Sequence, residues 1–207
     1  MTRGKSMDRR QSPLCLAPTH SEAANLKGEE SAQYRFPISD DLWQNLLVTL
    51  RDELSRLDTH QIQLLIRRIA EGIRSMDGVM TRYCELTCPF CEDPCCTGLK
   101  VFYNQADMLY LVTLGEELPP GQTRAQAAEP CRYLAPDGCL LPRIIRPYVC
   151  VWFICEAQME LFQAESAASQ RRFIETMQDV RACRLKIESL YEYYFPGQKK
   201  RHEGTPP

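Results

Sequence analysis

Apolar residues recur at three- and four-residue spacing in two neighbouring stretches, after a polar start that lacks any periodicity. The first stretch follows Ser39 or Asp40, either of which suits a helix N-cap. Its apolar positions are Leu42, Trp43, Leu46, Leu47, Leu50, Leu54 and Leu57. The second follows Thr59 and should end at Gly78, with Ile62, Leu65, Ile66, Ile69, Ile73 and Met76 on one face. The short break at Asp58 predicts that the two helices form an antiparallel hairpin.

The middle of the chain contains only short periodic pieces between turn signals. Residues 101–103 predict a short strand, and Asn104 is expected to cap a helix that extends to Leu114. Residues 116–130 contain two prolines followed by Gly121 and predict a loop. Asp137 and Gly138 predict a tight turn between two short extended pieces.

Two further helices are expected towards the C-terminus. Pro147 suits the first position of a helix because its missing N–H costs nothing there, and residues 147–162 are apolar on nearly all sides, so that helix should be buried. The last helix has apolar positions at Phe173, Met177, Val180, Cys183, Ile187, Leu190 and Tyr194. Together the patterns predict a mainly α fold: a helical domain with an irregular, cysteine-rich, metal-binding centre and a few short strands.

The length of 207 residues suits one domain with tails. We predict a disordered N-terminal arm at 1–36, a single helical domain at 37–196 that contains the cysteine-cluster region 84–155, and a disordered basic tail at 197–207. A hydrophobic fraction of 44% is sufficient for a real core, so the cysteines need not be its only support.

Charge and hydropathy give no indication of a nucleic-acid or membrane partner. The net charge of -2 and the pI near 6.0 give no sign of a nucleic-acid partner. The most apolar run, residues 148–155, is far too short to cross a membrane, and the N-terminal charges are not followed by an apolar signal segment. These features predict a cytoplasmic protein without a membrane partner. Cysteines that cluster in a reducing compartment indicate metal or redox chemistry rather than disulfides.

Nine of the eleven cysteines fall within residues 84–155. The predicted metal ligands are Cys84, Cys88, Cys91, Cys95, Cys96, Cys131, Cys139 and Cys150. All three histidines lie outside this block, so the site would be sulfur-rich, which favours zinc or an iron–sulfur cluster. Cys155 could be either a metal ligand or a core residue. Cys183 belongs to the apolar core stripe of the last helix, and Cys15 is expected to take no part in the site.

The adjacent pair Cys95 and Cys96 constrains any shared centre. Neighbouring side chains diverge in both strands and helices, so both can bind one ion only if the backbone turns sharply there. The spacing leaves open whether the cysteines form one metal centre or two. Positive charge near the thiolates could offset their charge or donate hydrogen bonds to sulfur, and the candidates are Arg82, Lys100, Arg132, Arg143 and Arg146.

The spacing of Cys84, Cys88 and Cys91, taken alone, resembles the radical SAM signature, in which three cysteines hold a [4Fe–4S] cluster and leave one iron for S-adenosylmethionine. Those enzymes place the motif after the first strand of a large β/α barrel. Here two helical stretches precede it and no repeating strand–helix units follow. A radical SAM or methylase-like enzyme is therefore the alternative function, and no catalytic residue is assigned.

The whole array resembles the YkgJ-type cysteine-cluster family, a zinc- or iron-chelating domain with a CxxCxxCC motif. The matching pieces are Cys88, Cys91, Cys95-Cys96-Thr97-Gly98, Cys131-Arg-Tyr-Leu, Asp137-Gly138-Cys139 and Arg146-Pro147-Tyr-Val-Cys150. This chain has three residues at 92–94 where the family has two, and Cys84 is an additional or replacement ligand. A related arrangement occurs in flagellin lysine methylases of the FliB type. The resemblance implies a protein that holds zinc or an iron–sulfur cluster, of the [4Fe–4S] type, in a structural or redox role.

Overall fold

The computed structural model of the chain describes residues 38–56, 59–92, 94–97, 101–124, 126 and 129–195. The chain divides into two compact units, 1–33 and 34–207, and every described residue belongs to the second. The predicted arm at 1–36 and the predicted tail at 197–207 lie outside the described residues, as do Cys15, Asp58 and Lys100.

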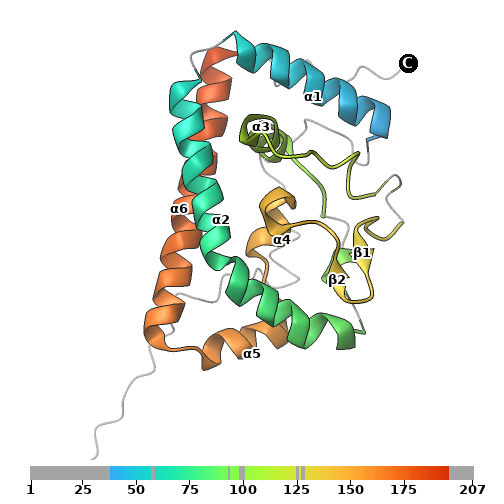
Figure 1. Cartoon of the computed structure of the whole chain (residues 1–207), viewed down its shortest axis with the longest axis vertical. Helices are drawn as coiled ribbons and strands as arrows, with labels where there is room; N and C mark the ends of the chain where they lie inside the picture. The colour runs from blue at the N-terminus through green and yellow to red at the C-terminus, as the bar shows by residue number, and fades with distance from the viewer. Residues whose placement is uncertain are drawn as a thin grey trace, which may run out of the picture. The chain divides into compact units, whose positions relative to one another are not determined.

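The described residues are mainly α-helical, which confirms the predicted mainly α fold (Figure 1), while the cysteine-rich, metal-binding centre stays a prediction. The α-helices are α1 (Asp40–Ser55), α2 (His60–Thr87), α3 (Gln105–Leu114), α4 (Tyr148–Trp152), α5 (Glu156–Ala164) and α6 (Ala167–Tyr194). Single 3₁₀ turns form η1 (Cys88–Phe90), η2 (Cys95–Thr97) and η3 (Arg143–Ile145). Strands β1 (Leu134–Ala135) and β2 (Gly138–Cys139) pair antiparallel, with Leu134 opposite Cys139.

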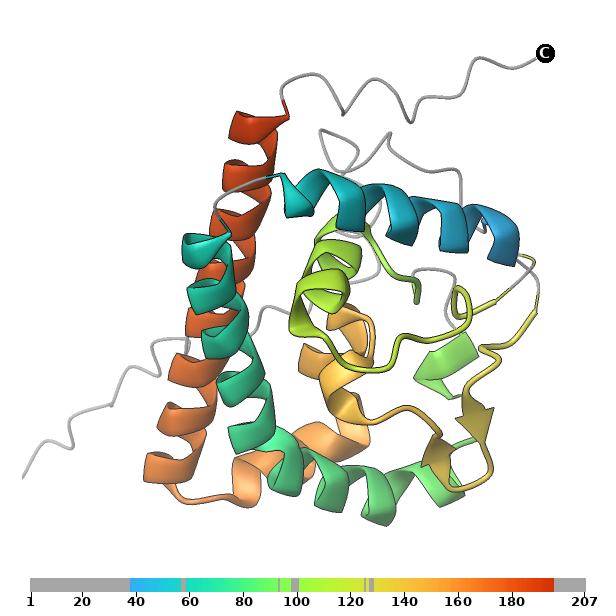
Figure 2. The same cartoon turned by 45° about the horizontal axis from the view of Figure 1, so that its top comes forward.

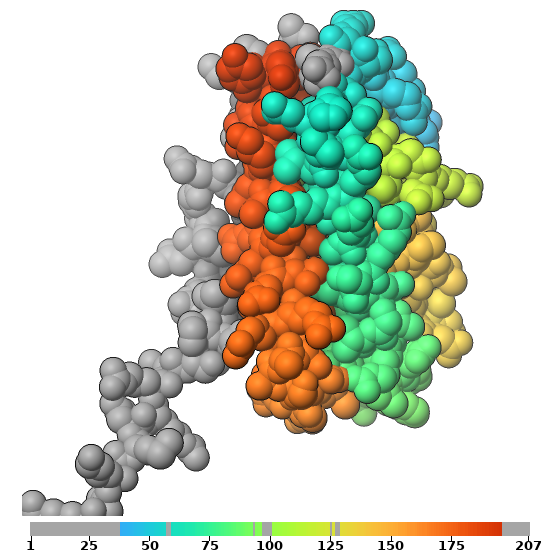
Figure 3. All heavy atoms as spheres, turned by 60° about the vertical axis from the view of Figure 1, so that its left-hand side comes forward, coloured from blue at the N-terminus to red at the C-terminus, as the bar shows by residue number. Residues whose placement is uncertain are grey.

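The long helices α2 and α6 run antiparallel and side by side, and they form the most extensive helix contact (Figures 1 and 3). Gly72 allows their close approach, because a Cβ at this position would meet Val180 Cγ2 at 2.5 Å. Arg68 forms an ion pair with Asp179 across the same contact. The predicted hairpin of the first two helices is wrong: α1 meets the N-terminal start of α2 at a steep angle and packs against α3 (Figure 2). Tyr110 and Leu111 of α3 help to fill the core beneath α1.

Helix α2 does not end at Gly78, as the sequence pattern predicts, but continues to Thr87. Gly78 lacks the left-handed backbone that ends a helix at glycine, whereas Gly115, with φ of 78°, adopts it directly after α3. The buried stripe of α2 continues through Met80 and Tyr83, and this burial outweighs the roughly 1 kcal/mol that a helical glycine costs. Helix α2 therefore extends into the cysteine-rich region and includes Cys84.

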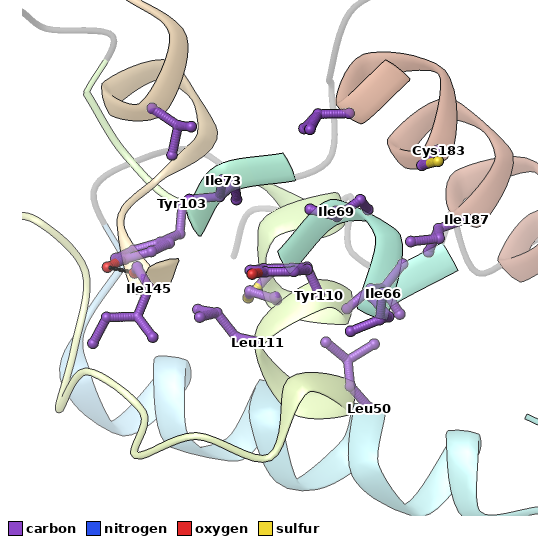
Figure 4. Close-up of a cluster of buried hydrophobic side chains, with 14 of the residues drawn as sticks. Leu50, Ile66, Ile69, Ile73, Tyr103, Tyr110, Leu111, Ile145, Cys183 and Ile187 are labelled. Carbon is purple, nitrogen blue, oxygen red and sulfur yellow. Dashed lines mark hydrogen bonds between the residues drawn. The ribbon is translucent and has the colours of Figure 1, made fainter. Parts of the chain in front are cut away.

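The core lies between α1, α2, α3 and α6, and its labelled side chains meet in Figure 4. Cys183 is 5% exposed and belongs to this core, as its place in the apolar stripe of the last helix predicts. At the end of α6 the prediction is wrong by three residues: Tyr194 is 40% exposed, whereas Tyr191 is 2% exposed and donates a hydrogen bond to Glu53 Oε2 at 2.6 Å. The contact with α1 therefore selects which tyrosine is buried.

The middle segments are irregular, with one difference from the expected strands. Residues 101–103 are not a strand; the Gln122 side chain instead bonds to both backbone groups of Tyr103, at 2.9 Å each. The predicted turn lies one residue earlier than expected, at residues 136–137 between β1 and β2, and Gly138, the first residue of β2, has a φ of 124°. The predicted loop at 116–130 is irregular at each of its described positions.

The single helix expected over 147–162 is instead two helices, α4 and α5, broken at Phe153–Cys155. Pro147 lies one position earlier than expected, as the N-cap residue of α4. A straight helix that is apolar on all sides would leave some of its faces in water. The break lets Val151 of α4 enter the core while α5 turns to pack against α2.

Candidate metal centre

The end of α2 presents the first two cysteines on one helix face. Cys84 lies in the last turn of α2, and the N–H of Cys88, its C-cap residue, donates to the Cys84 carbonyl. Residues four apart on a helix lie one above the other, so the two side chains are neighbours. Burial, reinforced by a hydrogen bond with Cys84, raises the pKa of Cys88 to about 11.

Two polar side chains from distant segments converge on the sulfur of Cys84. Arg143 Nη2 lies 3.7 Å from Cys84 Sγ, and Gln158 Nε2 lies 3.6 Å from the same sulfur and 4.0 Å from Cys88 Sγ. Arg143 is buried, and its Nε forms an ion pair with Asp77 Oδ1 at 3.0 Å. Hydrogen bonds to sulfur and a nearby positive charge are what a thiolate ligand requires from its surroundings.

The adjacent pair Cys95 and Cys96 lies in the tight turn η2, so the backbone does bend sharply there. A hydrogen bond from the Cys95 thiol lowers the pKa of Cys96 to about 6, against the opposing effect of burial, and the positive charges of Arg146 and Arg124 add to the lowering. The same hydrogen bond, together with burial, raises the pKa of Cys95. Arg124 Nη2 also donates to the Cys96 carbonyl at 3.2 Å. Cys96 is therefore the thiol of this pair that ionises at neutral pH.

Cys96 and three cysteines that follow it at long intervals in the chain are linked by electrostatic interactions. Cys131 precedes β1, Cys139 lies in β2 and Cys150 lies in α4. Cys150 interacts electrostatically with the other three, and Cys131 interacts with Cys139 and Cys96. We call Cys96, Cys131, Cys139 and Cys150 the sulfur cluster. Burial raises the pKa of both Cys131 and Cys150.

Buried polar contacts hold α4, and with it Cys150, against the rest of the fold. Asp107 accepts a hydrogen bond from the Tyr148 backbone N–H at 3.1 Å and forms an ion pair with Arg184 at 2.7 Å. Both charged side chains are less than a tenth exposed. Asp107 also closes the capping box of α3 with Asn104. One carboxylate thus links the first turns of α3 and α4 to α6.

The remaining cysteines lie at the margin of this region. Cys91 is exposed at the end of η1, where its backbone N–H donates to the Cys88 carbonyl at 3.2 Å. Cys155, half-buried at the N-cap of α5, interacts electrostatically with Cys95. Cys88 interacts in the same way with Cys96, which relates the pair on α2 to the sulfur cluster. Seven of the eight predicted ligands thus interact with at least one other through their thiols, and Cys91 is linked to Cys88 through the backbone.

The thiols are close without forming a finished coordination sphere. All ten described cysteines are free. Within the described part of the chain, no three cysteine, histidine or acidic side chains converge closely enough to hold one metal ion as they stand. The donor set itself fits zinc or iron–sulfur chemistry, because it consists of thiols with guanidinium groups beside them.

Of the arginines proposed from sequence, Arg143 and Arg146 act on cysteines, whereas Arg82 pairs with Glu165 and Arg132 with Asp40. Sequence reasoning missed Gln158 and Arg124. The sequence offered one weak indication of Gln158, because this residue follows Cys155 by about one helical turn. Arg124 lies in a loop without periodicity, and only the fold brings it to η2.

Comparison with protein-family models, curated proteins and solved structures finds no match to this chain. The resemblance to the YkgJ-type family therefore stays a prediction. None of the described helices combines the length and the apolar character that a membrane span requires.

Proposed function

We propose that this chain is a metal-binding cysteine-cluster protein that holds zinc or an iron–sulfur cluster through Cys96, Cys131, Cys139 and Cys150. One observation carries the proposal: four segments separated by up to 35 residues, in η2, before β1, in β2 and in α4, bring these thiols within electrostatic range of one another. A purely structural role for so many buried or half-buried free thiols would not require them to gather at one place.

The surroundings of the sulfur cluster also support this function. Arg146 and Arg124 place positive charge beside Cys96, which would offset the negative charge of several thiolates around one metal. Bound metal would supply the attraction that draws the thiolates together, since a thiol site of this kind gains its final geometry only when the metal binds. The resemblance to the YkgJ-type family points in the same direction.

The pair Cys84 and Cys88 would serve as a second group of ligands, with Cys95 and Cys91 as further candidates. Arg143 and Gln158 would hold the sulfur of Cys84 in place through the contacts described above. The role that we propose is structural or redox: the metal orders the irregular middle of the fold. Free thiols at this density suit a reducing compartment, so we also propose a cytoplasmic location.

The radical SAM alternative gains no support from the fold. Its motif cysteines lie at the end of a helix that follows another helix, and the described residues form one two-stranded sheet rather than a barrel. Reductive cleavage of S-adenosylmethionine by the anaerobically purified protein, dependent on Cys84, Cys88 and Cys91, would favour that alternative.

Metal analysis of the full chain tests the proposal. The protein is purified without oxygen, its visible spectrum is recorded, and iron, sulfide and zinc are counted per chain. A brown protein with sulfide indicates an iron–sulfur cluster, and a colourless protein with zinc indicates a zinc site. We expect Cys150→Ser and Cys131→Ser each to lose most of the metal, whereas Cys15→Ser, which removes one thiol far from the cluster in sequence, should retain it.

Two results would overturn the proposal. One is a chain that contains no metal and takes up neither zinc nor reconstituted iron and sulfide. The other is equal metal content in the Cys150→Ser, Cys131→Ser and Cys15→Ser variants, each shown by circular dichroism to be folded.

A further inference from the structure

A pocket of about 370 Å³ opens between α2, the end of α5 and the first half of α6. It forms where α2 turns away from α6 beyond their close contact at Gly72 (Figures 1 and 2). Met76 and Val79 of α2, Phe162 of α5 and Phe173 of α6 supply its apolar lining. The volume lies within the range of small-molecule sites.

Most polar groups of the pocket are engaged, either with one another or with the backbone of their own helix. Arg82 forms an ion pair with Glu165, which also accepts a hydrogen bond from Tyr83 at 3.3 Å. The hydroxyl groups of Ser75 and Thr176 donate to backbone carbonyls of their own helices, at 2.8 Å each. These pairs leave little unsatisfied polarity on the pocket walls.

Arg172 is the exception among the lining residues. Its side chain is exposed, and no acidic residue of the described chain forms an ion pair with it. Since Arg82 and Glu165 pair with each other, Arg172 gives the lining residues a net charge of one positive. The complementary ligand has one negative charge and a hydrocarbon body.

We infer that this pocket binds an amphipathic monocarboxylate, with the carboxylate at Arg172 and the hydrocarbon body against Phe162 and Phe173, whose ring centroids lie 5.4 Å apart. A neutral molecule could not form a charge-assisted hydrogen bond with Arg172, and the other two charged side chains of the lining, Arg82 and Glu165, already pair with each other. The inference does not depend on the cysteines, because no cysteine lines the pocket.

Titration of the full-length protein with sodium octanoate, followed by isothermal calorimetry or NMR, tests this site. We expect saturable binding at one site, and binding of octan-1-ol that is at least about fivefold weaker. Arg172→Gln should weaken octanoate binding about five- to tenfold, the effect of losing one solvent-exposed, charge-assisted hydrogen bond. Arg171→Gln removes the same charge from the neighbouring position, which does not line the pocket, and should leave the affinity within about twofold.

A pocket-filling variant gives an independent measurement. Gly78 lines the pocket, and a Cβ at this position would have no atom within 4 Å, so Gly78→Leu can place a side chain there without a backbone clash. This variant should fold and lose saturable octanoate binding. The inference is overturned by an absence of saturable binding, by equal affinity for octanoate and octan-1-ol, by equal effects of the two arginine variants, or by unchanged binding in folded Gly78→Leu. Should Gly78→Leu not fold, the arginine pair decides.

Discussion

Tyr103 and Tyr110 are both buried in the helical core, but their hydroxyl groups differ. Tyr103 donates a hydrogen bond to the Ile145 carbonyl at 2.7 Å, the interaction drawn in Figure 4. The Tyr110 hydroxyl is buried without a partner among the described residues. Burial raises the pKa of both groups, so both are neutral at pH 7.

Phenylalanine substitutions should therefore have opposite effects at these two positions. Tyr110→Phe removes an unsatisfied hydroxyl, so we expect the free energy of unfolding to stay equal or rise by up to about 1 kcal/mol. Tyr103→Phe removes the hydrogen bond to the Ile145 carbonyl and should lower the free energy of unfolding by about 1–3 kcal/mol. Urea denaturation followed by circular dichroism gives the free energy of unfolding of both variants, which are compared at the same metal content. Equal losses of stability would contradict the assignment.

At the scale of the helices, two glycines of α2 are placed in different surroundings. Gly72 faces Val180, where an added Cβ would approach to 2.5 Å, whereas a Cβ at Gly78 would have open space around it. Both residues lie inside the helix, so each costs backbone entropy. Only at Gly72 does the contact between helices require the missing side chain.

Alanine substitution separates these roles. Gly78→Ala should raise the free energy of unfolding by about 0.5–1 kcal/mol, the difference in helix propensity. Gly72→Ala, the matched control, should lower it by about 1–3 kcal/mol because α2 and α6 must move apart. Thermal and urea unfolding provide the measurement. A loss of stability in Gly78→Ala as large as that in Gly72→Ala would show that α2 has no such asymmetry.

The junction of α3, α4 and α6 depends on a buried ion pair. Asp107 and Arg184 are hydrogen-bonded on several sides: Arg184 also contacts Asn104 Oδ1 at 3.3 Å, and its guanidinium lies 4.2 Å from the centroid of the Tyr148 ring. A buried pair with these additional partners specifies one arrangement of the three helices more than it adds net stability. This arrangement fixes the position of α4 and therefore of Cys150, one of the four residues of the sulfur cluster.

At the scale of the whole molecule, metal uptake should release protons. Burial raises the pKa of Cys131 and of Cys150, so both thiols are protonated at pH 7.5, whereas Cys96, with a pKa lowered to about 6, is already a thiolate. Because a metal binds thiolates, we expect about two or more protons to be released per zinc and an apparent affinity that rises roughly 100-fold per pH unit near neutrality.

Calorimetric titration with zinc in buffers of different ionisation enthalpy counts the protons, and chelator competition at several pH values gives the affinity. Cys96→Ser removes a ligand that is already ionised, so it should weaken binding but change the proton count by less than about one. Release of fewer than about one proton per zinc by the unaltered chain would contradict the assignment of Cys131 and Cys150 as protonated ligands.

Local pattern was sufficient to predict most helices and several of their ends. Ser39 caps α1 and Asn104 caps α3 through side-chain hydrogen bonds to residues three positions on, an interaction that depends only on neighbouring sequence. The burial of Cys183 also follows from three- and four-residue spacing alone. The cysteine spacing indicated sulfur chemistry for the same reason, since residue type and interval are properties of the sequence.

The tertiary structure decided what local spacing leaves open. An amphipathic stripe shows which face of a helix is buried but not which element covers it, so the partnership of α2 with α6 and the continuation of α2 past Gly78 were determined by long-range packing. The break between α4 and α5 has the same origin. The sequence by itself determined that the thiols are many and closely spaced. Only the fold decided that Cys150 lies within electrostatic range of Cys96, Cys131 and Cys139.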